Sequence, residues 1–112
     1  MNAEQFRKLA LKQPEATEGE HQGHPDFRVS DKIFATLGPD GDWAMVKLRP
    51  DQQASYIKLE PSSYEPFAGA WGRRGCTRIE LGGAQTKRVA EAVHAAWRNT
   101  APKKLLALHE EA

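Results

Sequence analysis

The amino-acid sequence predicts an α+β domain in which helices pack on an antiparallel β-sheet. Strand-like patterns gather in residues 17–48, helical patterns lie on either side of them, and the turns between the strands are too short for parallel crossovers. Strands and helices segregated in this way are typical of the α+β class. The length of 112 residues is that of one domain, so we expect residues 1–112 to form a single unit.

The first expected element is a short helix over residues 2–12. Asn2 is a suitable N-cap. Phe6, Leu9 and Ala10 follow at spacings of three and four, so they share one face of the helix. Pro14 ends it.

The stretch 17–48 is expected to form a meander of antiparallel strands. Ser30-Asp31 is typical of a tight turn, and the glycines and proline of residues 38–42 predict a hairpin turn. The segments with strand-favouring or alternating residues are 17–21, 27–29, 33–37 and 43–48. Alternation in the last of them predicts Trp43, Met45 and Lys47 on one face of the sheet and Ala44, Val46 and Leu48 on the other.

The second half of the chain contains the remaining helices and one strand. Pro50 opens a helix that Pro61 ends. Residues 62–71 are expected to be irregular, with Phe67 and Trp71 anchoring them to the core. Residues 76–81 alternate and predict the last strand. After the glycine pair 82–83 we expect a helix from about 84 to 99 and, after Pro102, a further short helix. The apolar stripe of the longer helix consists of Val89, Ala92, Val93, Ala96 and Trp97.

Charge is unevenly distributed along a chain whose net charge is only +1. The segment 71–104 carries eight basic residues and two acidic ones, a net of +6, so the rest of the chain has a net charge of about −5. This asymmetry is compatible with a polyanionic partner. It is equally compatible with charges that are simply solvated.

Composition also bounds the location of the protein. One cysteine, Cys76, cannot form an internal disulfide, which fits a reducing compartment. The sequence contains no apolar run of signal-peptide or membrane-spanning length. We therefore expect a cytoplasmic protein that does not bind a membrane.

The candidate metal ligands are His21 and His24, with Glu18, Glu20 and Asp26 close by. A metal site requires several such side chains to converge on one ion. In a strand and turn, we expect the two rings to point to different sides. The sequence therefore favours a solvated polar edge over a metal site, and we expect no cofactor.

Cys76 is the candidate nucleophile, with His94 as its base and Arg74 and Arg78 as flanking cations that would lower its pKa. The alternative is a small buried core residue, which is the more frequent role of an isolated cysteine. No other nucleophile, acid and base occur at a spacing that catalysis requires. We expect no catalytic residue and no enzymatic activity.

A glycine-rich segment, residues 69–75, contains two adjacent arginines. It lacks the lysine and the spacing of a phosphate-binding loop. Its glycines favour a sharp turn. Arg73 and Arg74 would project from such a turn, where guanidinium groups either bind phosphate in two-point fashion or remain solvated.

Several stretches taken together resemble the MmcQ/YjbR family of small bacterial proteins. The resemblance rests on their order and spacing: Pro14 to Glu18, Gly23 to Val29, Lys32 to Leu37, Val46 to Leu48, Gly69 to Gly75, and Ala96 to Arg98. The family implies a CyaY-like fold and a "double wing" sheet surface that would meet DNA. Lys32 and Lys47 match family positions on the strands, and Trp71 matches the family tryptophan, for which a core anchor is an equal explanation.

The leading hypothesis is therefore a nucleic-acid-binding domain, and the residues expected to bind are Lys32, Lys47, Arg73, Arg74 and Arg78. Strong duplex binders are usually clearly basic, so we expect DNA binding to be weak or conditional. The alternative is a protein-interaction or small-ligand module, because three tryptophans and four phenylalanines could leave an apolar patch exposed. Iron handling is disfavoured because the first helix has one acid, Glu4, against three bases. We expect a monomer, and the sequence does not identify a protein partner.

Overall fold

The structure, a computed structural model, describes residues 1–109 and confirms the α+β class. The strands are β1 (Thr17–His21), β2 (His24–Val29), β3 (Lys32–Leu37), β4 (Trp43–Lys47), β5 (Tyr64–Pro66) and β6 (Cys76–Glu80). The helices are α1 (Ala3–Leu11), α2 (Pro50–Leu59), α3 (Gly69–Arg73), α4 (Thr86–Thr100) and α5 (Lys103–His109), with a short 3-10 turn η1 (Leu81–Gly83) before α4.

The strands form one sheet in the order β1-β2-β3-β4-β6-β5, with antiparallel pairing throughout the part of the chain described. The predicted meander is β1 to β4. Two-residue turns join its first three strands at Gln22-Gly23 and Ser30-Asp31. All four turn residues have positive φ angles, as tight hairpins of this kind require. The predicted turn at Ser30-Asp31 is therefore confirmed.

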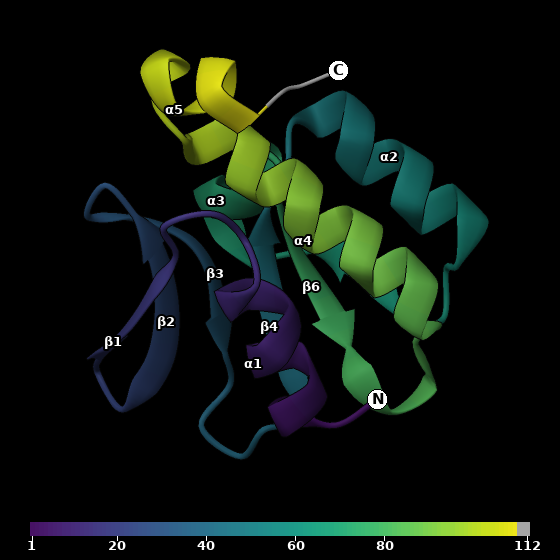
Figure 1. Cartoon of the computed structure of the whole chain (residues 1–112). Helices are drawn as coiled ribbons and strands as arrows, with labels where there is room; N and C mark the ends of the chain where they lie inside the picture. The colour runs from purple at the N-terminus through teal and green to yellow at the C-terminus, as the bar shows by residue number, and fades with distance from the viewer. Residues whose placement is uncertain (110–112) are drawn as a thin grey trace.

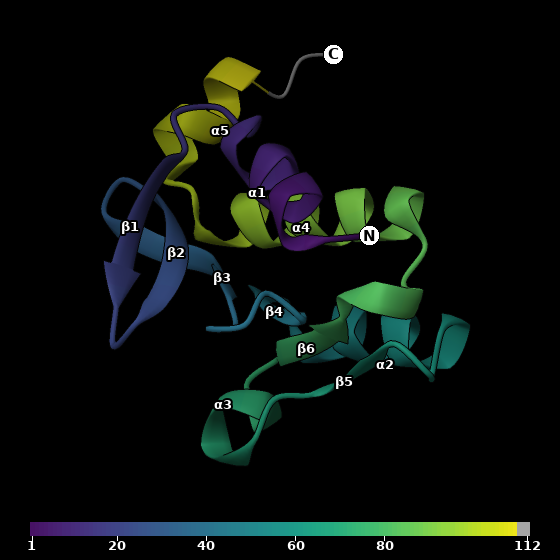
Figure 2. The same cartoon turned by 90° about the horizontal axis from the view of Figure 1, so that it is seen from below.

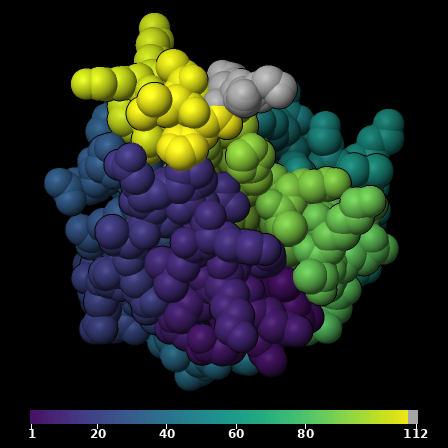
Figure 3. All heavy atoms as spheres, viewed as in Figure 1, coloured from purple at the N-terminus to yellow at the C-terminus, as the bar shows by residue number. Residues whose placement is uncertain are grey.

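Helices cover one face of the sheet. α4 packs on β3 and β4, and α1 packs on α4 (Figures 1 and 2). The predicted apolar stripe of α4 is buried in this layer, from Val89 to Trp97. Seen as spheres, this side of the molecule is formed largely by α1 in purple, α4 in green and α5 in yellow (Figure 3).

α2 lies beside α4 and runs antiparallel to it, with a contact at each end (Figure 1). At one end, Arg88 of α4 donates to Glu60 over 3.0 Å. At the other, Arg49 donates to Asn99 over 3.2 Å. The Arg49–Asn99 contact fixes the start of α2, which follows directly after β4, against the last turn of α4.

The segment predicted to be irregular is ordered instead. Residues 64–66 form the edge strand β5, and residues 69–73 form the short helix α3. α3 lies on the side of the sheet opposite α4 (Figure 2). Trp71 on α3 is 56% exposed, so the prediction that it anchors the segment to the core is wrong. The core lies on the other side of the sheet, out of reach of this helix.

Within the described residues, no helix combines the length and the apolar character that crossing a membrane requires.

Candidate functional site

The sheet face away from α4 carries the polar and aromatic side chains of the strands. Alternation and register place these residues there: His21 of β1; His24, Asp26 and Arg28 of β2; Ile33 and Thr36 of β3; Trp43, Met45 and Lys47 of β4; Cys76, Arg78 and Glu80 of β6. The sequence predicted the correct face for Trp43, Met45 and Lys47. We call this surface the open face.

Four rings form a continuous row across the open face. Their centroids are 5.8 Å apart for His21 and His24, 5.9 Å for His24 and Trp43, and 5.7 Å for Trp43 and Phe67. The two histidine rings were expected on different sides of the strand, and that expectation is wrong. A two-residue hairpin pairs His21 directly with His24, and directly paired residues share a face.

A pocket of about 490 Å³ opens between this row of rings and α3. Trp43, Met45, Phe67 and Trp71 supply its apolar lining, and Lys47 is among its polar residues. Its volume falls in the range of sites that hold small organic ligands, roughly 300–1,000 Å³. A second hollow of about 470 Å³ adjoins it, because Ile33 and Lys47 line both.

Asp26 organises the β1–β2 end of the open face. Its side chain is fully buried and accepts two hydrogen bonds from Arg28, at 2.8 and 2.9 Å. It also contacts His21 Nδ1 at 2.7 Å. The Arg28 hydrogen bonds, with a smaller contribution from His21, lower the pKa of Asp26. Asp26 therefore orients the His21 ring and neutralises the charge of Arg28.

Cys76 lies in the pocket wall but has the character of a core residue. Its side chain is 6% exposed, and burial raises the pKa of the thiol. The nearby positive charges of Lys47 and Arg74 oppose that rise. His94, weighed as its base, contacts Gln13 at 2.9 Å and stacks on Trp97 in the helix layer. The structure therefore does not bring Cys76 and His94 together.

Within residues 1–109, no three His, Cys, Asp or Glu side chains lie together as a metal site requires.

Lys47 and Arg74 are two predicted binding residues that lie in or beside the pocket wall. Lys47 lines it, and the Arg74 guanidinium lies over the Trp71 ring, 5.6 Å from its centroid. Lys32 lines the adjoining hollow together with Lys47, and Arg73 ends α3. Within the described part of the chain, no carboxylate lies within 4.0 Å of these four cations.

Arg78, the fifth predicted residue, is already engaged. Its guanidinium forms a 2.6 Å ion pair with Glu80 and lies 3.7 Å from Glu65. It also covers the Trp43 ring at 4.6 Å. Arg78 therefore fixes the Trp43 ring, and its charge is largely neutralised by the two glutamates.

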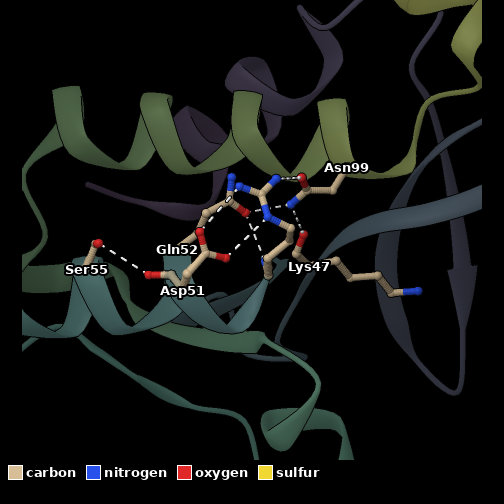
Figure 4. Close-up of polar contacts among 6 residues, drawn as sticks. Lys47, Asp51, Gln52, Ser55 and Asn99 are labelled. Carbon is tan, nitrogen blue, oxygen red and sulfur yellow. Dashed lines mark hydrogen bonds and ion pairs between the residues drawn. The ribbon is translucent and has the colours of Figure 1, made fainter.

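Asn99 holds the Lys47 backbone in place. Its Nδ2 donates to the Lys47 carbonyl at 3.1 Å and to Gln52 Oε1 at 2.8 Å, while its Oδ1 accepts from Arg49 at 3.2 Å. The Lys47 side chain extends away from this network (Figure 4). Sequence reasoning missed Asn99, because a contact across 52 residues leaves no local pattern.

Gln53 of α2 connects α3 to the sheet. Its Nε2 donates to the carbonyls of Gly72 and Cys76, both at 3.0 Å. Gly72 itself packs tightly, because a Cβ there would lie 1.9 Å from the Phe67 carbonyl oxygen. These contacts fix the helix that carries Trp71 and therefore one wall of the pocket.

Comparison with known proteins gives a family model and two solved structures. The family model described as YjbR matches residues 11–99. A Deinococcus radiodurans protein with the family-model domain DUF419 superposes with a TM-score of 0.69 and 14% identity, over 96% of this chain and 79% of that one. A Pseudomonas syringae protein superposes with a TM-score of 0.68 and 20% identity, over 89% of this chain and 99% of that one. No functionally curated protein matches in sequence.

Proposed function

The chain belongs to the YjbR family, and we propose that its open face binds nucleic acid. The observation that carries this proposal is a set of cations that have no carboxylate partner among residues 1–109, beside a pocket with aromatic walls. Lys47 lines the pocket, and Arg74 lies over the ring of Trp71 in its wall. Lys32 lines the adjoining hollow, and Arg73 ends α3. Cations bind phosphates and aromatic rings stack on bases, so this pairing of residue types fits a nucleic-acid strand.

The paired arginines limit the strength of the proposed interaction. Arg28 and Arg78 lie on the same face, but Asp26 and Glu80 neutralise them. About four cations then remain for phosphate contacts. With a net charge of only +1 on the chain, long-range attraction to DNA is small. The proposal is therefore a modest affinity that depends on salt.

Salt dependence of oligonucleotide binding tests the proposal. Fluorescence anisotropy would follow a labelled oligothymidylate of about 12 nucleotides between about 50 and 200 mM salt. Each phosphate neutralised on a single strand contributes about −0.7 to the slope of log K against log salt. Four contacts predict a slope of about −3, and Lys47→Ala with Arg74→Ala should reduce its magnitude by about 1.4.

The matched control removes two cations from the helix layer, Lys87 on α4 and Lys104 on α5. This double variant has the same net charge as the double variant on the open face. It should bind like the unaltered protein. Equal weakening by both double variants would indicate a nonspecific charge effect, and absence of binding at low salt for single strands and duplexes would overturn the proposal.

A small-ligand module is the second candidate, and the pocket volume of about 490 Å³ favours it. In either case we propose a binding role without catalysis. The buried Cys76 thiol and its separation from His94 support that proposal. A ligand that binds in the pocket but carries no phosphate would favour this second candidate.

A further inference from the structure

We propose that the pocket accepts an unpaired base of a single-stranded nucleic acid, with Trp71 as its stacking surface. This inference rests on the proposed function and names the form of nucleic acid that the open face takes.

Trp71 is unusually exposed for a tryptophan on a helix that is held firmly in place. Its side chain is 56% exposed, whereas Trp97 in the core is 1% exposed. α3 is nevertheless held firmly, because Gln53 donates to the Gly72 carbonyl of α3 and the Cys76 carbonyl of β6, and Gly72 packs against the Phe67 backbone. The ring is therefore a large apolar surface on a fixed support. Stacking surfaces for bases have these properties, because every base has a π-face.

The cations lie where the phosphates of such a strand would pass. Arg74 lies over the Trp71 ring at 5.6 Å, and Lys47 lines the same pocket. Both charges act on the thiol of Cys76, a residue that lines the same pocket. A base stacked on Trp71 would therefore have a basic side chain close to its own or its neighbour's phosphate.

The concave shape of the pocket distinguishes an unpaired base from a duplex. In a duplex both faces of each base are covered by neighbouring bases, so the indole has no face to stack on. The pocket of about 490 Å³, which Trp43, Phe67 and Trp71 line, has the volume to hold a planar group. Lys32 and Lys47 line the adjoining hollow, which would continue the path of the backbone.

Abasic strands separate base binding from phosphate binding. Anisotropy would compare an oligothymidylate of about 12 nucleotides with a strand of equal length in which every base is removed. An RNA strand, oligouridylate, and a DNA duplex complete the set. We expect the thymidylate to bind at least about tenfold more tightly than the abasic strand and the duplex. The comparison of thymidylate with uridylate shows whether the protein distinguishes DNA from RNA.

Trp71 variants then locate the base. Trp71→Ala should weaken thymidylate binding about 5- to 150-fold, the range that one stacked base contributes, and leave abasic binding unchanged. Trp71→Phe retains a ring and should recover most of the affinity. Leu59→Ala is the control, because Leu59 is a comparably exposed apolar residue, 60% exposed, on α2.

The outcomes distinguish the two proposals. Equal affinity for abasic strand, thymidylate and duplex, unaffected by Trp71→Ala, would overturn the base pocket and leave nucleic-acid binding intact. Failure of every strand to bind at low salt would overturn both. Strand binding that Trp71→Ala weakens and Trp71→Phe restores would support both.

Discussion

Asp26 is the residue on which the open face most depends for its electrostatics. Its carboxylate is fully buried, accepts hydrogen bonds from Arg28 and contacts His21, and these contacts stabilise the charged form of Asp26. Its pKa is lowered in the folded protein. The stabilisation is therefore complete above the unfolded value of about 3.9 and is lost as pH falls through the folded pKa.

Asp26→Asn should consequently destabilise the protein by about 1–3 kcal/mol at neutral pH, because the amide cannot satisfy both partners. Urea unfolding at several pH values would measure the difference from the unaltered protein. That difference should be constant above about pH 4 and shrink below it. Asp40→Asn, in an exposed turn, is the control of equal charge. A difference that does not change with pH would contradict this assignment.

Tyr64 shows the opposite situation, a buried polar atom without a partner. Its hydroxyl forms no hydrogen bond within residues 1–109, and burial raises its pKa. Tyr64→Phe should therefore leave stability unchanged or raise it by up to about 1 kcal/mol. Thermal unfolding would measure it against Tyr56→Phe, the partly exposed ring stacked on Tyr64. A loss above about 1 kcal/mol would mean that a bound water satisfies the hydroxyl.

At the scale of elements, α3 forms one wall of the pocket on the open face, because it carries Trp71. Alanine in place of glycine within a helix usually stabilises by about 0.5–1 kcal/mol. Gly72→Ala should instead destabilise by about 1–3 kcal/mol, because its Cβ would meet the Phe67 carbonyl oxygen and the backbone would have to move. Hydrogen exchange of the α3 amides should locate the effect.

Gly82→Ala is the matched control for that substitution. No atom lies within 4 Å of a Cβ at Gly82, so the change should alter stability by less than about 0.5 kcal/mol. If Gly72→Ala were equally harmless, α3 would not be held against residue 67, and the pocket wall would be looser than the structure indicates.

The elements predicted correctly are those whose patterns are local. The stripe of α4 from Val89 to Trp97 is periodic, and Trp43, Met45 and Lys47 alternate, so their faces follow from spacing alone. The shared face of His21 and His24 was not predicted, because it depends on a turn of only two residues between their strands. The expected irregular segment contained a five-residue helix too short for a periodic signal, and that helix carries Trp71.

The candidate site was only partly predictable for a related reason. The resemblance to the family selected Lys32, Lys47 and Trp71, and the structure places Lys47 and Trp71 at one pocket. The pairing of Arg78 with Glu80 was not predicted, although both lie on one strand two residues apart. Asn99 and Gln53 position the site through contacts between distant elements, which only the fold reveals.

In the whole molecule, the two faces of the sheet differ in what covers them. One face is covered by α1, α2 and α4 and forms the core. The other carries the pocket and the cations for which the described part of the chain supplies no carboxylate partner. Basic residues also occur on the covered side, including Lys87, Lys103 and Lys104. The distribution of charge along the sequence therefore does not identify the binding face. A measurement that reports which residues contact the ligand is needed.

Backbone amide NMR during titration with an oligothymidylate is that measurement. Amides of β4, of α3 and of the start of β6 should shift most, with Lys47, Trp71 and Arg74 among them. Amides of α1 and of the first half of α4 should shift least. Largest shifts on α4 and α5 around Lys87 and Lys104, or no shifts at low salt, would contradict binding at the open face.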